Sequence, residues 1–295
     1  MQIKRSGFVA VVGRANVGKS TLLNTLIGQK VAIVSHRAQT TRERIFGVLT
    51  RGEMQIVFVD TPGYHTAKNR LGEHMIKQTT GALEDIDLAL LVVEPNCYIS
   101  EVEQELIERL RRQKAPVILV INKMDTVQKQ ELLPVIAKYS EQMAFAAVIP
   151  ISAKLALGVD ELLTQIEAYI PEGVAYFPED AVTDRMESQL AADIVREKLL
   201  FYLDKEVPHG IAVYTEAMKK RADADVYDID VVIYCEKASH KGIIIGKNGA
   251  MLKRVGVAAR RDIEKMLAAR VYLTCFVKVA ENWRNKENII RDLGL

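Results

Sequence analysis

The fold of this chain is decided by one stretch near its start, Gly13-Arg14-Ala15-Asn16-Val17-Gly18-Lys19-Ser20. An apolar run, residues 8–12, comes before it, and residues 21–26 have the pattern of a helix. Because of the Gly-x-x-x-x-Gly-Lys-Ser spacing, consecutive backbone N–H groups can turn inward around a phosphate at the start of a helix. A chance glycine-rich turn is disfavoured because the motif has the strand and helix that it needs. The stretch therefore predicts a phosphate loop, residues 13–20.

Two side chains of the phosphate loop have predicted chemical roles. We expect the Lys19 ammonium to reach the β- and γ-phosphate oxygens and the Ser20 hydroxyl to bind Mg²⁺. Thr21, at the start of the helix, is expected to join the nucleotide site. The glycines at 13 and 18 permit a backbone geometry and a close approach that bulkier residues would hinder.

Length and composition predict a folded protein of two domains. The chain has 295 residues, and at about 150 residues per domain each part can bury its own core. Apolar residues make up 49% and charged residues 26%, which is ordinary for a globular protein. Since the formal net charge is only +2, any nucleic-acid surface must be local.

The cysteines and apolar runs indicate the compartment. Cys97, Cys235 and Cys275 are an odd, widely spaced set without zinc-ligand spacing, so we expect reduced thiols and no structural metal. The first strand begins within about seven residues, which leaves no room for a signal peptide, and runs such as residues 88–93 are too short to span a bilayer. We expect a soluble cytoplasmic protein, with peripheral membrane contact left open.

A second nucleotide element follows a predicted hairpin. Residues 35–42 have no apolar period and predict a mobile loop that leads into two paired strands, 44–50 and 55–59. The second strand ends in Asp60-Thr61-Pro62-Gly63. Asp60 can hold the Mg²⁺ shell, usually through water, and Gly63 can offer its N–H to the γ-phosphate. Alone, these four residues are equally typical of an ordinary turn.

Three further apolar runs, residues 86–93, 115–121 and 144–151, predict strands separated by helices. Residues 100–103 have capping-box spacing and open the first of these helices. Strands alternating with helices predict an α/β fold with a mainly parallel sheet covered on both faces, and with ligands at the carboxyl ends of its strands. Two of those ends carry polar motifs, Asn122-Lys123-Met124-Asp125 and Ser152-Ala153-Lys154.

The spacing Asn-Lys-x-Asp favours guanine. An ionised carboxylate at Asp125 can accept from N1–H and the exocyclic amine of guanine, whereas adenine offers no such pair of donors. Unpaired polar groups in such a site would reject the wrong base by several orders of magnitude. We expect Asn122 to brace the neighbouring loops, the Lys123 stem to lie along the purine, and the Ala153 N–H to meet the guanine carbonyl. Alone, the motif is most often a helix cap or a turn.

Residues 171–185 predict a linker. They contain two prolines and four acidic residues without an apolar period. They separate a first domain, residues 1–170, from a second, smaller α+β domain, residues 186–295. Its predicted elements are a helix at 191–203, strands at 211–215 and 227–235, two helices, a strand at 271–279 and a short C-terminal helix.

A glycine-bounded turn lies between the two central helices of the second domain. The apolar run Ile243-Ile244-Ile245 leads into Gly246-Lys247-Asn248-Gly249, hereafter the Gly-x-x-Gly turn. Such a turn lets a nucleic-acid backbone approach closely, and Lys247 supplies charge to a phosphate. Residues 239–270 contain eight Lys or Arg against two acids. An ordinary helix–helix turn is the alternative, but the element order and the local charge favour a KH module, in which Ile244 and Ile245 would pack under the bases.

Together, these motifs resemble the translation-factor-like GTPases, and within them the Era family of bacterial ribosome-assembly GTPases. The resemblance rests on the phosphate loop, on Asp60 to Gly63, on the two polar motifs after the later strands, and on residues 38–42. It extends through residues 178–185 and the KH-like part, so it covers nearly the whole chain. Two residues depart from the family pattern: Ala15 stands where proline is usual, and Tyr64 where an aliphatic residue is usual.

The resemblance implies a switch that binds GTP or GDP with Mg²⁺, hydrolyses GTP and binds ribosomal RNA of the small subunit. The implied partner is the small ribosomal subunit, and the implied role is its assembly. We expect a monomer, with peripheral association at the inner face of the cell membrane left open. The alternative is a GTPase switch whose C-terminal module binds a protein or a membrane surface.

The expected binding residues form three sets. The nucleotide set comprises Gly13, Arg14, Ala15, Asn16, Val17, Gly18, Lys19, Ser20, Thr21, Asp60, Thr61, Pro62, Gly63, Asn122, Lys123, Asp125, Ser152, Ala153 and Lys154. The RNA set comprises Ile244, Ile245, Gly246, Lys247, Asn248, Gly249, Lys253 and Arg254. The metal set comprises Ser20, Thr40, Thr41 and Asp60, with Thr41 preferred over Thr40.

For catalysis we expect Lys19, Thr41, Gly63 and Asn16 to act. Tyr64 cannot orient water as the glutamine of many switch GTPases does, so intrinsic hydrolysis should be slow. No arginine finger is evident in the sequence. In related GTPases an asparagine at the place of Asn16 helps to hold potassium. The hypothesis is that K⁺ supplies the missing positive charge, with residues 35–41 closing over it.

Overall fold

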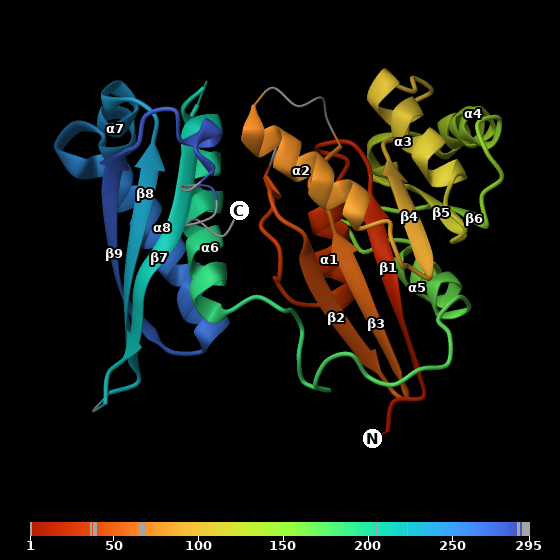
Figure 1. Ribbon diagram of the computed structural model, residues 1–295, viewed down its shortest axis with the longest axis horizontal. Helices are drawn as coiled ribbons and strands as arrows, with labels where there is room; N and C mark the ends of the chain where they lie inside the picture. The colour runs from red at the N-terminus through yellow and green to blue at the C-terminus, as the bar shows by residue number, and fades with distance from the viewer. Residues whose placement is uncertain are drawn as a thin grey trace. The chain divides into compact units, whose positions relative to one another are not determined.

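The computed structural model describes residues 2–35, 37, 40–64, 69–204, 206–222, 224–287 and 290. The chain divides into two compact units. The first unit comprises residues 1–32, 41–68 and 72–184, and the second comprises residues 33–40, 69–71 and 185–295. Each unit has its own sheet (Figure 1).

The first unit contains a six-stranded sheet with the strand order β2-β3-β1-β4-β5-β6. Only the β2–β3 pair is antiparallel, so the predicted α/β fold with a mainly parallel sheet is confirmed. The strands are β1 (Arg5–Val12), β2 (Ile45–Arg51), β3 (Met54–Asp60), β4 (Leu88–Val93), β5 (Val117–Ile121) and β6 (Ala147–Pro150). The helices are α1 (Lys19–Ile27), α2 (Arg70–Gly81), α3 (Glu101–Arg111), α4 (Lys129–Ser140) and α5 (Val159–Glu167), with a 3₁₀ turn, η1, at Met124–Thr126.

Both faces of this sheet are covered, which explains why its strands are apolar without alternation. In β1, Val9 and Val11 pack in a core with α1 and α5, whereas Ala10 and Val12 pack in a second core with α3 and α4. Parallel strands point their carboxyl ends to one edge of the sheet. The polar residues that follow β1, β3, β4, β5 and β6 therefore gather at that edge.

Residues 171–184 run along the first unit and are hydrogen-bonded to it. The Ser6 N–H donates to Pro171 O at 3.1 Å, and the Ser6 hydroxyl donates to Val174 O at 2.6 Å. The Gln55 side-chain oxygen accepts the N–H groups of Tyr176 and Phe177 at 2.8 and 2.9 Å. Because these contacts run through the backbone and a buried amide, the segment needs no apolar period to be held. The predicted linker is therefore bound along the first unit over these residues.

The second unit has a three-stranded sheet, β7 (Ile211–Lys220), β8 (Val226–Cys235) and β9 (Arg270–Val279), in that order. β7 and β8 are antiparallel and β8 and β9 are parallel. One face is covered by α6 (Glu187–Tyr202), α7 (Ala238–Ile245) and α8 (Ala250–Leu267), which share a core with it (Figure 1). This is the smaller α+β domain that the element order predicts.

Short 3₁₀ turns connect elements of this unit and follow its last strand. They are η2 (Val207–Gly210), η3 (Lys247–Gly249) and η4 (Trp283–Asn285). Trp283 is fully buried and its indole N–H donates to Gly210 O at 2.9 Å, which fixes the C-terminal segment to the unit. Where a short C-terminal helix is predicted, the structure has η4; residues 288, 289 and 291–295 lie outside the described part of the chain.

Among the residues that the structure describes, no helix is long and apolar enough to cross a lipid bilayer.

Candidate nucleotide site and nucleic-acid surface

The phosphate loop is closely enclosed. Gly18 has φ 99°, a conformation that L side chains rarely adopt, and an added Cβ would lie 2.2 Å from Asn122 Nδ2. That amide donates to Val17 O at 2.8 Å. At the other end of the loop, a Cβ on Gly13 would lie 2.3 Å from Val92 O. The two glycines are therefore required both by the loop and by the strands and side chains around it.

Lys19 is held inside the phosphate loop. It is only 6% exposed, and its ammonium donates to Gly13 O and Arg14 O, both at 3.0 Å. Burial lowers the pKa of Lys19 to about 8, although the nearby Asp60 carboxylate opposes that change. Burial disfavours an unpaired charge, so a phosphate group bound here would stabilise the Lys19 ammonium by supplying the opposite charge.

Three oxygen-bearing side chains meet beside Lys19. The Ser20 hydroxyl donates to Asp60 Oδ2 at 2.8 Å, and the Thr41 hydroxyl lies 3.0 Å from Ser20 Oγ. Asp60 is fully buried, and burial raises the pKa of its carboxyl, partly opposed by Lys19 and by hydroxyl hydrogen bonds. Its second oxygen, Oδ1, has no hydrogen-bond partner among the described residues.

This donor set fits a hard divalent cation, because such ions take carboxylate and hydroxyl oxygens. The unpartnered Asp60 Oδ1 is the kind of buried acceptor that a metal-bound water would satisfy. The structure brings Ser20, Thr41 and Asp60 together, whereas the Thr40 hydroxyl donates to the backbone oxygen of Arg37 at 2.7 Å. Of the loop predicted at 35–41, residues 36, 38 and 39 lie outside the described part of the chain.

The turn after β3 is fixed against the phosphate loop. The Thr61 hydroxyl donates to Val11 O at 3.0 Å, and the Thr79 hydroxyl of α2 donates to Pro62 O at 3.0 Å. An added Cβ on Gly63 would lie 2.7 Å from Ala15 Cα. The backbone of Gly63 therefore lies against the loop, near where a γ-phosphate would be bound.

The predicted base-binding residues lie at the ends of β5 and β6. Asn122 connects them with the phosphate loop, because its side-chain oxygen accepts the Ala153 N–H at 2.9 Å while its amide binds Val17 O. The Lys123 ammonium donates to Asn16 O at 2.8 Å. Asp125 is exposed, in η1, and Lys154 is exposed as well. The carboxylate of Asp125 is thus accessible to a base.

The Gly-x-x-Gly turn of the second unit is enclosed at its first glycine, where a Cβ on Gly246 would lie 2.7 Å from Met251 Cβ, and open at its second. Gly246 and Gly249 have φ 73° and 76°, and a Cβ on Gly249 would meet nothing within 4 Å. Between them, Lys247 and Asn248 are exposed. A backbone without side chains at its ends, with a cation at its tip, can approach a phosphate chain closely.

The apolar residues before this turn differ from the expectation. Ile244 is fully buried in the core of the second unit, so the prediction that its side chain packs under bases is wrong for this structure. Ile245 is partly buried and packs against the same core. Ile243 is 50% exposed and is the most accessible isoleucine of this run. Burial differs along the run because successive residues of a helix point to different sides.

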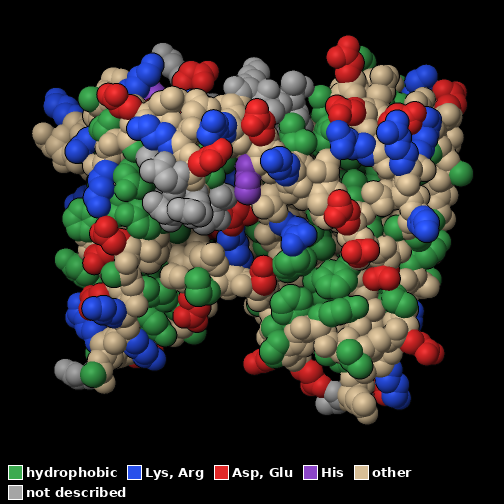
Figure 2. Space-filling view, in the orientation of Figure 1, with side chains coloured by type: hydrophobic (Ala, Val, Ile, Leu, Met, Phe, Trp, Pro, Cys, Tyr) green, Lys and Arg blue, Asp and Glu red, His purple; other side chains and the backbone are tan. Residues whose placement is uncertain are grey.

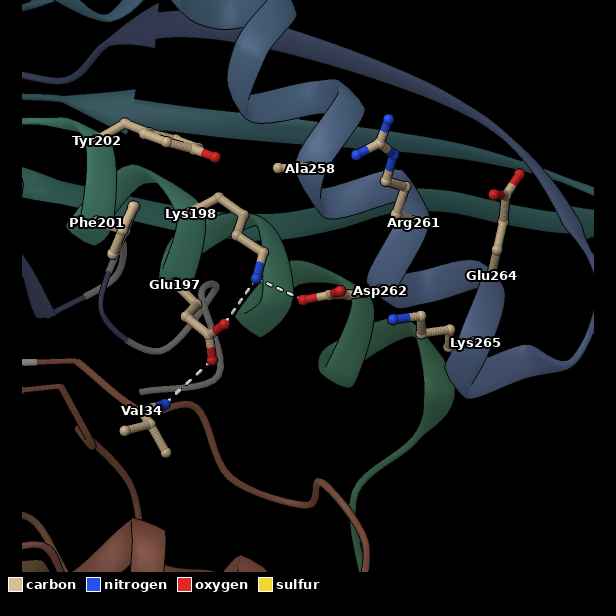
Figure 3. Close-up of a pocket in the computed structure, with 10 residues that line it drawn as sticks. All are labelled: Val34, Glu197, Lys198, Phe201, Tyr202, Ala258, Arg261, Asp262, Glu264 and Lys265. Atoms are coloured by element: carbon tan, nitrogen blue, oxygen red, sulfur yellow. Dashed lines mark hydrogen bonds and ion pairs between the residues drawn. The ribbon is translucent and has the colours of Figure 1, made fainter. Parts of the chain in front are cut away.

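The basic residues after the turn lie on α8. Lys253 and Arg254 are exposed, and the Arg254 guanidinium lies 4.2 Å from the ring centroid of Tyr202, a cation–π contact. Alongside, a cavity of about 820 Å³ lies between α6 and α8 (Figure 3). There Lys198 pairs with Glu197 at 2.9 Å and with Asp262, so charges of both signs line the cavity. On the face of the molecule shown in Figure 2, basic and acidic side chains are interspersed in the same way.

Known proteins match this chain along nearly its whole length. Residues 8–123 match the family described as "50S ribosome-binding GTPase", and residues 206–284 match the family described as "KH domain". The GTPase Era of Clostridioides difficile (strain 630) is 50% identical over 291 residues, which cover 98% of each chain. The chain belongs to the Era family of GTPases.

Solved Era structures agree with the fold. Era of Aquifex aeolicus, in a variant crystallised with GDP·AlF₄⁻, matches with a TM-score of 0.95 and 38% identity, over 98% of this chain and 99% of that one. Era in complex with MgGDPNP and nucleotides 1506–1542 of 16S ribosomal RNA matches with the same score and identity, over 99% of each chain. The predicted family, a GTPase domain followed by a KH domain, is confirmed, and the protein is a GTPase.

One charged residue of the site, Glu94, was not predicted from the sequence. Glu94 follows β4 and forms ion pairs with Arg14 of the phosphate loop and with Lys123 of the base motif. Arg14 Nε also lies 3.4 Å from Glu103 Oε1, a carboxylate that is almost fully buried. Its position in the sequence could have indicated a role in the site, because Glu94 follows an apolar strand at the edge of the sheet where Asp60 and Asn122 lie.

Proposed function

We propose that this Era-family GTPase binds small-subunit ribosomal RNA through the Gly-x-x-Gly turn and acts in assembly of the small ribosomal subunit. The observation that carries the proposal is the open turn at residues 246–249, with exposed Lys247 and Asn248 and with Lys253 and Arg254 one helical turn farther on. The related Era structure was solved with nucleotides 1506–1542 of 16S ribosomal RNA.

The nucleotide site supports binding of GTP or GDP with Mg²⁺. We propose Ser20, Thr41 and Asp60 as the residues that hold the metal, which when bound neutralises charge on the β- and γ-phosphates. Lys19 supplies a second positive charge from within the loop, and Gly63 supplies an N–H donor. Asp125, with Asn122 bracing the loops, selects guanine.

Potassium is a further proposed component. Asn16 has φ 67° in the phosphate loop, and its backbone oxygen already accepts the Lys123 ammonium. We propose that its side chain helps to hold K⁺ beside the phosphates, where the transition state of phosphoryl transfer gains negative charge.

We also propose the functional boundaries and the setting. Residues 1–170 form the GTPase domain, 171–185 the connection and 186–295 the KH-type domain, in keeping with the division of the chain near residues 184 and 185. The three cysteines are free thiols, which suits a reducing compartment such as the cytoplasm. We take the protein to act as a monomer.

The experiment is to crosslink RNA to the full-length protein in its GTP and GDP states and to sequence it. We expect fragments from the 3′ region of small-subunit ribosomal RNA, with yields that differ between the two states. In parallel, the affinity for a matching RNA should fall steeply as salt rises, because phosphate contacts release counterions. Enrichment of no particular RNA, together with binding to anionic vesicles or to a protein, would favour the alternative role of the C-terminal module.

A further inference from the structure

Tyr64 follows Gly63 directly and is built into the first unit. The residue is 3% exposed and belongs to the core that α3 and α4 share with the sheet. Its backbone N–H donates to Gly13 O at 3.1 Å, and Tyr64 forms an isolated parallel bridge with Arg14. The chain just after Gly63 is therefore attached to the phosphate loop itself.

The phenol of Tyr64 reaches α3. It donates to Glu105 Oε1 at 2.6 Å, and Arg109 Nη2 donates to the same oxygen at 3.0 Å. The Arg109 guanidinium also lies 5.5 Å from the centroid of the Tyr64 ring. Burial and the hydrogen bond to Glu105 raise the pKa of Tyr64 to about 12, while the bond from the phenol lowers the pKa of Glu105. At neutral pH the pair is a protonated donor and an ionised acceptor.

Packing alone does not account for this arrangement. A phenylalanine or an aliphatic side chain could fill the same apolar position, and neither would need a partner on α3. A charge-assisted hydrogen bond, in contrast, fixes where the ring and its backbone lie. Glu105 and Arg109 have side chains that are 57% and 41% exposed, so both lie at the rim of the core, where they can hold the phenol without being buried themselves.

We propose that Tyr64 is a positioning residue for GTP hydrolysis, which fixes the Gly63 N–H beside the phosphate loop through its bond to Glu105 and Arg109. Gly63 lies between two anchors: the Thr79 hydroxyl bound to Pro62 O on one side, and Tyr64 on the other. An N–H donor that is already in place needs no reorganisation when charge develops on the γ-phosphate. The anchor thus acts on the chemical step, and GDP, which lacks that phosphate, is not affected by it.

The experiment compares Tyr64→Phe, Glu105→Gln and the double variant in single-turnover GTP hydrolysis at saturating nucleotide. Each single variant should slow hydrolysis about tenfold, as expected for one hydrogen bond to a charged group. The double variant should be no slower than either single variant, because both remove the same interaction. GDP affinity and melting temperature should stay close to the parent. Glu108→Gln is the matched control, since it removes an exposed carboxylate of α3 that pairs with Arg111 instead.

Three results would overturn the proposal. One is a parental hydrolysis rate in Tyr64→Phe or in Glu105→Gln; because Glu105 is exposed, its variant tests the idea even if the core variant folds poorly. The second is a loss of GDP affinity as large as the loss of rate, which would mean that the variants damage the nucleotide site in general. The third is the same rate loss in Glu108→Gln.

Discussion

Gly18 in the phosphate loop and Gly249 in the Gly-x-x-Gly turn both have positive φ, at 99° and 76°, but their surroundings differ. A Cβ on Gly18 would lie 2.2 Å from the Asn122 side chain, whereas a Cβ on Gly249 would meet nothing within 4 Å. The phosphate loop is therefore held by the protein around it before a ligand arrives. At Gly249 the turn leaves free space to a ligand, so contacts at that glycine have to come from the partner.

The same contrast extends to the charges. Lys19 is buried and hydrogen-bonded to its own loop, while Lys247 is exposed. A preorganised, buried site can be selective for one small ligand, because any polar group left unpaired is costly. An exposed turn attracts a polyanion mainly through charge, and its binding depends on salt.

The largest effect is expected for the base contact. Asp125→Asn replaces an acceptor of two guanine donors, so GTP affinity should fall by about two to three orders of magnitude while XTP affinity rises. Fluorescent-nucleotide titration with both triphosphates would measure this. Asp160→Asn, an exposed carboxylate at the start of α5, should leave both affinities unchanged. Parental GTP affinity without a gain for XTP would contradict the guanine assignment.

A smaller effect is expected from adding a side chain at Gly18. Gly18→Ala should weaken GDP binding by about ten- to a hundredfold, because the new Cβ displaces Asn122 from Val17 O. Gly28→Ala is the matched control, since Gly28 also has positive φ, at 75°, but open space around it. Both variants strain the backbone, so equal losses of nucleotide affinity and of melting temperature would show that the enclosure of Gly18 has no special role.

These residues also show how far the sequence alone can be followed. The phosphate loop, Asp60 and Asn122 can be located because short motifs carry their own geometry and the strands bring their ends to one edge. The order of elements likewise follows from apolar runs and their periods. The α/β fold and the α+β second unit could be predicted in this way, whereas the family was predicted from the resemblance of the motifs.

What could not be predicted depends on contacts between distant segments. The pairing of Glu94 with Arg14 and Lys123, and of Tyr64 with Glu105, needs the packed positions of several elements. Residues 171–184 are held by hydrogen bonds to their backbone and by single aromatic contacts such as Tyr176 with Phe8, and neither leaves a period in side-chain hydropathy. Ile244 was misplaced because an apolar residue beside a binding turn can face either the core or the ligand.

A still smaller effect is expected from potassium. If K⁺ beside Asn16 supplies charge to the transition state, single-turnover hydrolysis should be about tenfold faster in KCl than in NaCl at equal ionic strength. Asn16→Ala should lose most of that difference. Equal rates in the two salts at saturating GTP would refute the proposal and would leave a protein partner or the ribosome as the source of the charge.

We propose that nucleotide chemistry lies in the enclosed site and RNA binding at the Gly-x-x-Gly turn, where Gly249 is open. The most direct test of this claim is Gly249→Asp, which puts a negative charge where a phosphate should pass, measured beside Gly52→Asp. Gly52 matches Gly249 in positive φ, at 60°, and in open space, but lies in the β2–β3 turn. We predict that only Gly249→Asp loses RNA affinity, by about tenfold or more at matched salt, while both variants hydrolyse GTP at nearly the parental rate. If Gly249→Asp binds RNA like the parent in filter binding, the claim is contradicted.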